Sequence, residues 1–348
     1  MALTISVVIP TYRRPQDLAA CLDSILGQSV MPLEVIVVDN EAAQSTQTLV
    51  RQCEAKYSEC QITLRYLANK KNSLPFARNL GVKSSSGEIV LFLDDDFILE
   101  SGYLDEIIRM YEGKPGVLGV QGYVGGDASR SYRMRALFFL PRPEEGKCRV
   151  MPSIYTTYPL NLEEPIPCEY LSGCNASFRR LILTEFAFDE NLLKYSFGED
   201  LDLSYRISQC YPKSLWITPF ARGIHKVSPA GRSADKEAAT LSEVYRLYIF
   251  YKLFSTKARN KVIYIWSTLG QILGKLTSPS PVALLEIKHL LEALILCLRH
   301  LNDIRRGDLG FFNNTLSEMA VPHAEAIQAP IENCDTCHIH RVKYPKGE

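Results

Sequence analysis

The sequence predicts an α/β fold with a mostly parallel central sheet, followed by a helical region. Strand-like segments in the first third of the chain are continuous apolar runs, as expected of parallel strands buried on both faces. Segments with apolar residues at helical spacing separate these runs. Strands that alternate with helices favour a parallel sheet covered on both faces.

The elements of the first third follow in a regular order. Residues 5–10 (ISVVIP) form the first predicted strand, and residues 16–28 form a helix with apolar residues recurring on one face. Further strands are predicted at 34–39, 62–67 and 88–93, and further helices at 46–58 and 75–84.

The middle of the chain, about 113–170, is rich in Gly and Pro and is harder to assign. A strand is expected within 117–124 and a long loop over 142–167, which contains five prolines. Helices at 181–185 and 201–209 and a strand at 214–218 follow.

Domain organisation follows from this pattern. Residues 1–232 are predicted to form a catalytic domain, with a nucleotide-binding half (about 1–112) and an acceptor half (about 113–232). Residues 233–317 are predicted to be helical, with helices at 234–254, 260–276 and 282–300. The tail, 318–348, has a mixed composition and is expected to be flexible.

Composition narrows the class of protein. Apolar residues make up 46% of the 348 residues, which excludes a wholly disordered chain. Lys+Arg and Asp+Glu are equal at 39 each, so the overall charge gives no indication of nucleic-acid binding. We expect a cytoplasmic protein with reduced thiols, since the N-terminus lacks the pattern of a signal peptide. A membrane span is not expected, because no window holds about 20 uninterrupted apolar residues.

Polar residues follow three of the predicted strands. Pro10-Thr11-Tyr12 ends the first strand, Asp39 the second, and Asp94-Asp95-Asp96 the fourth. Open α/β sheets bind ligands at this edge. Adjacent carboxylates repel unless a cation or hydrogen-bond donors compensate, and oxygen ligands suit Mg²⁺ or Mn²⁺. The alternative to a metal site at Asp94-Asp95-Asp96 is an acidic turn that caps a helix.

Six segments in order resemble glycosyltransferase family 2, whose fold is GT-A. They are 6–12 (SVVIPTY), 35–39 (VIVVD), 77–81 (ARNLG), 92–96 (FLDDD), 172–179 (SGCNASFR) and 198–206 (GEDLDLSYR). The resemblance covers roughly residues 4–255. It implies an inverting enzyme that transfers a sugar from a nucleotide-sugar donor, most often a UDP-sugar, to a hydroxyl acceptor on a glycan or a lipid-linked precursor.

The resemblance also implies roles for individual residues. Asp200 would be the general base that takes the proton of the acceptor hydroxyl, with Glu199 as the second candidate. Asp96 and His225 would bind Mn²⁺ or Mg²⁺, and His225 would favour Mn²⁺. The donor nucleotide would contact Pro10, Thr11, Tyr12, Arg14, Asp39, Arg78, Asp94 and Asp95. From the residues alone, Glu199-Asp200 could instead cap a helix, and His225 could be structural.

Three other functions are consistent with parts of this pattern. A processive synthase would carry several membrane spans and a Gln-x-x-Arg-Trp motif, and the chain has no Arg-Trp pair. A nucleotidyltransferase would carry a Gly-rich basic loop after the first strand, where this chain has residues 10–15 (PTYRRP). A non-catalytic sugar-nucleotide binding or scaffold protein is the third alternative.

The helical region is basic. Between residues 222 and 306 Lys and Arg number 14 and Asp and Glu number 6, a net charge of +8. A basic amphipathic segment is typical of a peripheral contact with the inner face of the cytoplasmic membrane. The alternative is that these helices pack on the catalytic domain or on another subunit.

The end of the tail carries residues of metal-ligating type. Cys334, Cys337, His338 and His340 have the spacing of zinc ligands but lack a second Cys-x-x-Cys pair. A flexible tail is the preferred interpretation. The sequence leaves the sugar, the nucleotide, the acceptor and the oligomeric state open.

Overall fold

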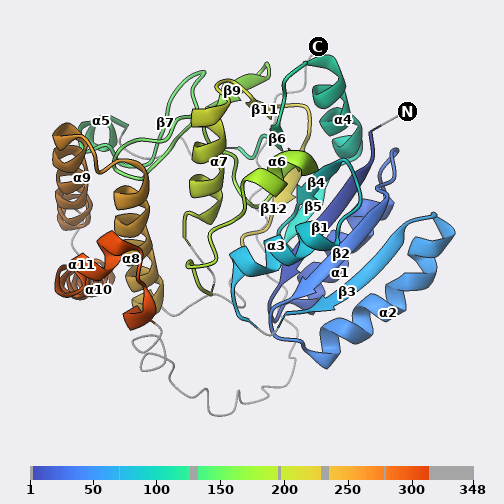
Figure 1. Cartoon of the computed structure of the whole chain (residues 1–348), viewed down its shortest axis with the longest axis horizontal. Coiled ribbons are helices and arrows are strands. Elements are labelled where there is room, and N and C mark those ends of the chain that lie inside the picture. Colours follow the sequence, from blue (N-terminus) through green and yellow to red (C-terminus); the bar gives the residue numbers. More distant parts are fainter. Residues whose placement is uncertain are drawn as a thin grey trace.

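The structure is a computed structural model, and it describes residues 3–69, 71–125, 132–194, 197–228, 235–277 and 280–312. The predicted tail and its Cys334, Cys337, His338 and His340 lie outside these residues. Figure 1 shows a sheet at the centre, helices on both of its faces, and a group of helices at one end.

The centre of the molecule is an eight-stranded mixed sheet with the order β3-β2-β1-β4-β10-β6-β11-β9. The first four strands in this order, β3, β2, β1 and β4, are parallel to one another, and β6 is parallel to β11. The strands are β1 (Ile5–Thr11), β2 (Glu34–Asp39), β3 (Thr63–Ala68), β4 (Ile89–Phe92), β6 (Gly119–Gly122), β9 (Ile166–Cys168), β10 (Ala176–Arg179) and β11 (Leu215–Thr218).

The antiparallel strand β10 was not predicted. It lies between β4 and β6 and joins the two parallel groups into one sheet. Its four residues, ASFR, are too short and too mixed in polarity to be recognised as a strand. Its position brings the segment just before it, residues 172–175, beside the acidic turn after β4.

Two hydrophobic cores cover the faces of the sheet. Val7 and Ile9 of β1 enter one core, and Val8 between them enters the other, as the twofold alternation of a strand requires. The helices over the sheet are α1 (Pro15–Leu26), α2 (Gln44–Glu59), α3 (Leu74–Ser84), α4 (Tyr103–Gly113), α6 (Arg180–Glu185) and α7 (Glu199–Cys210). Helix α3 packs very closely on β1, because a Cβ at Gly81 would lie 2.2 Å from Val8 Cγ1.

Short elements connect the two halves. Strands β5 (Phe97–Leu99) and β12 (Gly223–His225) form an antiparallel pair in which His225 lies opposite Phe97. The region predicted as a long loop contains β7 (Arg142–Pro143) and β8 (Thr157–Tyr158), and helix α5 (Tyr132–Leu137) precedes it. The β5–β12 pair carries His225 to the acidic turn, 129 residues away in sequence from Asp96.

The C-terminal region is helical, as predicted, with α8 (Asp235–Leu253), α9 (Ala258–Leu276), α10 (Pro281–Arg299) and α11 (Leu301–Arg306). Helix α8 packs on the rest of the chain, since its Leu241, Val244 and Ile249 share a core with Ile154 and Leu201. Helices α9 and α10 lie at the end of the molecule remote from α2 (Figure 1). Among the described residues no helix is long and apolar enough to cross a membrane.

Candidate active site

The acidic turn after β4 is held against the loop before β10. The backbone N–H of Asp94 donates to the carbonyl of Cys174 at 3.0 Å. The three carboxylates of the turn then point in different directions: Asp94 lines a cavity, Asp95 contacts Thr11 and Arg14, and Asp96 contacts His225.

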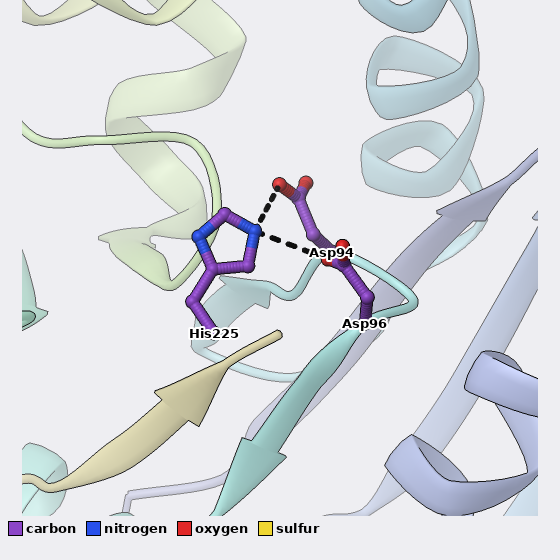
Figure 2. A group of neighbouring side chains, drawn as sticks. All are labelled: Asp94, Asp96 and His225. Atoms are coloured by element: carbon purple, nitrogen blue, oxygen red, sulfur yellow. Dashed lines mark ion pairs between the residues drawn. The ribbon is translucent and has the colours of Figure 1, made fainter. Parts of the chain in front are cut away.

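Asp94, Asp96 and His225 form the one group of metal-ligand type found among the described residues (Figure 2). His225 Nε2 lies 3.1 Å from Asp96 Oδ1 and 3.8 Å from Asp94 Oδ2. One ligand atom of each residue lies within 4.8 Å of the others. Asp96 Oδ1 is buried and makes no hydrogen bond of regular geometry within the described structure. The group therefore offers two carboxylates and an imidazole, and this set of ligands fits a divalent cation.

The contacts within the group of Asp94, Asp96 and His225 favour an ionised Asp96 and a protonated His225. Burial opposes the ionised form of Asp96, but His225 and the backbone N–H of Ser228, 2.8 Å from Asp96 Oδ2, lower its pKa below the ordinary value. Burial alone would lower the pKa of His225, but contacts with Asp96 and the Cys174 thiol raise it to about 10. A proton on His225 therefore neutralises the carboxylates, and a bound cation would replace it.

Asp95 supports the turn from behind. Thr11 Oγ1 donates to Asp95 Oδ2 at 2.7 Å, and Arg14 Nη1 lies 3.2 Å from Asp95 Oδ1 and 3.5 Å from Asp96 Oδ2. Burial raises the pKa of Asp95 to about 7, against the opposing effects of Thr11 and Arg14. Asp95, Thr11 and Arg14 are all buried, so their side chains brace the turn, and a direct contact with the donor stays a prediction for them.

Arg78 connects the acidic turn to the start of α7. Its guanidinium contacts Glu199 Oε1 at 2.7 Å and Asp94 Oδ1 at 3.4 Å, and it donates to the carbonyl of Gly173 at 3.0 Å. Glycine is needed at 173, because a Cβ there would lie 2.4 Å from Arg78 Nη2. Arg78 is nearly fully buried. It therefore fixes the relative position of Glu199 and Asp94.

Asp200 faces the same cavity with an oriented carboxylate. Asp200 Oδ2 accepts from the backbone N–H of Gly173 at 2.9 Å and from the Tyr170 hydroxyl at 3.1 Å. Glu199 is buried and engaged by Arg78, whereas Asp200 is partly exposed. Of the two candidate bases, Asp200 is the better placed to meet an acceptor.

The cavity has a volume of about 350 Å³ and joins these groups. Asp94 and His225 line it together with Glu199 and Asp200. One wall comes from the proline-rich region before β9, with Pro141, Ile154, Tyr155 and Thr156, and Tyr170 just after β9 extends it. Carboxylates from two separate segments, the turn after β4 and the start of α7, therefore line the same cavity.

Pro10, Tyr12 and Asp39, which were predicted to contact the donor, lie at the carboxyl ends of β1 and β2. Tyr12 is half-buried, while Pro10 is buried. Asp39 accepts from the backbone N–H groups of Glu41 and Ala43 at 3.0 and 2.8 Å and from the Tyr66 hydroxyl at 3.0 Å. These bonds shape the loop that leads into α2. A carboxylate has about four acceptor positions, so a contact of Asp39 with a base remains sterically open and stays a prediction.

Sequence reasoning missed several residues of this site. The Tyr170 hydroxyl donates to Asp200, and the backbone N–H of Ser228 donates to Asp96. Tyr155 lines the cavity. Nothing in the local pattern around Tyr155 or Tyr170 sets them apart from other aromatic residues of a loop. Their role follows from the long-range packing of the proline-rich region and appears only in three dimensions.

The mixed sheet, with an acidic turn at the end of β4, is the arrangement of a GT-A fold. The GT-A likeness is confirmed by the solved structure of GalNAc-T7 with UDP, GalNAc and Mn²⁺, which has a TM-score of 0.57 at 16% identity and covers 84% of this chain and 54% of that chain. The family model for glycosyl transferase family 2 matches residues 6–186. The chain belongs to glycosyltransferase family 2.

Relatives are found in bacteria and archaea. The chain is 25% identical over 247 residues to the amylovoran biosynthesis glycosyltransferase AmsB of Erwinia amylovora, covering 69% of this chain and 75% of that protein. It is 33% identical over 116 residues to the GalNAc(5)-diNAcBac-PP-undecaprenol beta-1,3-glucosyltransferase of Campylobacter jejuni, covering 33% and 37%. The chain spans 39% and 40% of the length of two further relatives, from Bacillus subtilis and Haloferax volcanii.

Proposed function

We propose that this chain is a metal-dependent, inverting glycosyltransferase that adds a single sugar from a nucleoside diphosphate sugar to a hydroxyl acceptor. The observation that carries the proposal is the single cavity shared by Asp94, His225 and Asp200. An anomeric carbon between a leaving diphosphate and an attacking hydroxyl needs cationic charge on one side and a base on the other. The cavity offers both.

The leaving-group side would be formed by Asp94, Asp96 and His225. These residues would hold Mn²⁺ or Mg²⁺, and the bound cation would neutralise charge on the departing diphosphate. The imidazole favours Mn²⁺ over Mg²⁺ in this ligand set. Arg78 would keep Asp94 in place through its ion pair.

The acceptor side would be formed by Asp200. Its carboxylate would accept the proton of the acceptor hydroxyl as the oxygen attacks from the face opposite the diphosphate, so the configuration inverts. Tyr170 and the Gly173 N–H orient Asp200. Glu199, neutralised by Arg78, would position the acceptor or the turn rather than take the proton.

UDP is the first candidate nucleotide, since the solved GT-A structure of GalNAc-T7 contains UDP with Mn²⁺. The acceptor is proposed to be a lipid-linked or polysaccharide precursor. The name of the Campylobacter jejuni relative describes a glycan on undecaprenyl diphosphate, and that of AmsB describes amylovoran biosynthesis. With such an acceptor, the enzyme would work at the inner face of the cytoplasmic membrane.

The donor site is tested by thermal shift with UDP, GDP, dTDP and CMP, each with and without Mn²⁺. A ligand at about 100 times its dissociation constant stabilises the native state by about 2.7 kcal/mol, which raises Tm visibly. We expect one diphosphate to stabilise the chain only with Mn²⁺, and Asp96→Ala to remove the effect. If no nucleotide stabilises the chain, a scaffold role replaces the catalytic one. If a nucleotide binds but the donor sugar is neither transferred nor hydrolysed, the chain is a binding protein.

Metal affinity is expected to rise with pH from about neutral toward alkaline pH. Without metal, the pKa of His225 is about 10, so the imidazole carries a proton at neutral pH. A cation binds neutral imidazole, so it must displace that proton, and binding releases about one proton per chain. Calorimetry of Mn²⁺ binding in buffers with different ionisation enthalpies measures this release. His225→Asn should abolish the release; an unchanged release in that variant would place the proton on another group.

A further inference from the structure

The outer face of α9 is apolar and exposed. Val262, Ile265, Trp266, Leu269, Leu273 and Leu276 are each between 41% and 66% exposed. Their spacing of three, one, three, four and three residues places them on one stripe of the helix. The opposite stripe, with Ile263, Tyr264, Ser267 and Gly270, is buried against the protein.

Helix α5 extends this surface. The ring of Phe138 stacks on Trp266 with centroids 5.0 Å apart, and Trp266 Nε1 donates to the carbonyl of Leu137 at 2.9 Å. A Cβ at Gly270 would lie 2.3 Å from Phe138 Cβ, so the two segments are in direct contact. Met134 and Leu137 of α5 are also exposed. We call the exposed apolar residues of α5 and α9 the α5–α9 face.

Cations border the α5–α9 face. Arg133 precedes Met134, and Lys257, Arg259 and Lys261 are exposed at the start of α9. Among the described residues none of these four takes part in an ion pair. Helix α9 has no acidic residue in its first turn, although acidic residues are the ones that stabilise a helix N-terminus. Cations at that end weaken the helix, so their presence points to a partner.

The charge pattern selects the partner. The four cations at the border of the α5–α9 face carry positive charge with no ion pair among the described residues, so a partner of negative charge would complement them. An anionic bilayer attracts them, while aliphatic side chains and Trp enter the boundary between headgroups and acyl chains. Helix α10 also exposes leucines, but its Glu286 and Glu292 pair with Lys275 and Lys236. The four cations beside the α5–α9 face, in contrast, take part in no ion pair within the described part of the chain.

We propose that the α5–α9 face docks the enzyme on an anionic lipid surface. The chain continues from Leu137 directly to Pro141, which lines the cavity and whose carbonyl accepts from Arg135 at 2.7 Å. Docking therefore brings the proline-rich wall of the cavity to the membrane. The delivery of a lipid-linked acceptor to that wall rests on the proposed function; the docking itself does not.

The test is cosedimentation of the full chain with vesicles, without donor or acceptor. We expect binding to vesicles of phosphatidylcholine with phosphatidylglycerol, weaker binding to phosphatidylcholine alone, and a loss of binding at high salt. Val262→Glu with Ile265→Glu should lower the partition coefficient about tenfold or more. Arg259→Gln with Lys261→Gln should lower it about 25-fold on anionic vesicles, at about fivefold per cation. Leu181→Glu on α6, where the leucine is 80% exposed and lies outside the α5–α9 face, is the control and should bind as the wild type does.

The outcomes separate the two proposals. Unchanged vesicle binding in the Val262→Glu, Ile265→Glu variant overturns the docking face, provided that the variant keeps its metal-dependent nucleotide thermal shift. The proposal is also overturned if the wild-type chain does not bind vesicles but forms dimers that the Val262→Glu, Ile265→Glu variant disrupts. The face would then be an interface between two copies of the chain. Vesicle binding with no nucleotide effect leaves the docking face in place and rejects the catalytic role.

Discussion

Asp200→Asn is expected to lower kcat about 10²–10⁴-fold, the range found when a positioned general base is removed. The amide oxygen of Asn still accepts from the Gly173 N–H and the Tyr170 hydroxyl, which keeps the side chain oriented. The variant loses the ability to take a proton and the local bond from the Leu201 N–H to Asp200 Oδ1, since an amide NH2 cannot accept. The rate is measured as nucleotide released from the donor sugar that matches the nucleotide found by thermal shift.

The expected pattern is a low kcat with an unchanged nucleotide site. Metal-dependent stabilisation by the nucleoside diphosphate should be the same in Asp200→Asn and in the wild type, because Asp200 has no contact with Asp96 or His225 among the described interactions. A variant that loses both rate and nucleotide binding would indicate that Asp200 supports the structure of the donor site instead.

Glu199→Gln is the matched control, since it removes a charge from the neighbouring residue. Glu199 is buried against Arg78 at 2.7 Å, so its loss leaves Arg78 with Asp94 as its remaining carboxylate partner. We expect a lower Tm and a smaller fall in kcat than in Asp200→Asn. A larger fall in kcat for Glu199→Gln would exchange the roles that we assign to the two residues.

The first half of the fold could be predicted from the sequence because its signals are local. Strands β1, β2 and β4 are apolar runs buried on both faces, and the polar residues after them lie at the edge that parallel sheets use for ligands. The metal-ligand group joins Asp96 to His225 because β12 pairs with β5. That pairing has no local signal, so the metal role of His225 rested on resemblance alone.

The wall of the cavity is harder to predict for the same reason. The wall of the cavity comes from a proline-rich region whose few ordered pieces, β7 and β8, are two residues long. Its position depends on contacts with distant parts of the chain, such as the bonds from Arg246 of α8 to the Ser153 carbonyl and from Gln121 of β6 to the Tyr158 hydroxyl. A sequence pattern finds the carboxylates of a site more readily than the loops that surround them.

The sequence left two alternatives for the C-terminal helices: packing on the protein is observed for α8 and for one stripe of α9, and membrane contact stays a prediction. Helix α8 packs on the catalytic part through Leu241, Val244 and Ile249. Helix α9 buries one stripe and exposes the other. A basic amphipathic pattern predicts an apolar stripe but gives no indication of whether protein or lipid covers it, so only the exposed fraction distinguishes the two.

The second large effect is expected at Arg246 on α8, which is fully buried. Its guanidinium donates to Glu243 Oε2 at 2.7 Å, to Thr268 Oγ1 at 2.7 Å and to the carbonyl of Ser153 at 3.3 Å. It also lies 4.3 Å from the ring centroid of Tyr264. Arg246 thus joins α8 to α9 and to the segment that carries Tyr155 into the cavity wall.

Arg246→Met is expected to lower the free energy of unfolding by about 3–5 kcal/mol, because Glu243 would stay buried without its partner. Urea unfolding measures this as a lower midpoint at an unchanged m-value. The double variant Glu243→Gln, Arg246→Met should recover a large part of the loss, since replacing both charges removes the uncompensated one. If the double variant is as unstable as the single one, the loss comes from the packing of Arg246 against Tyr264 and Tyr155 and from its bonds to α9, and the ion pair itself contributes little.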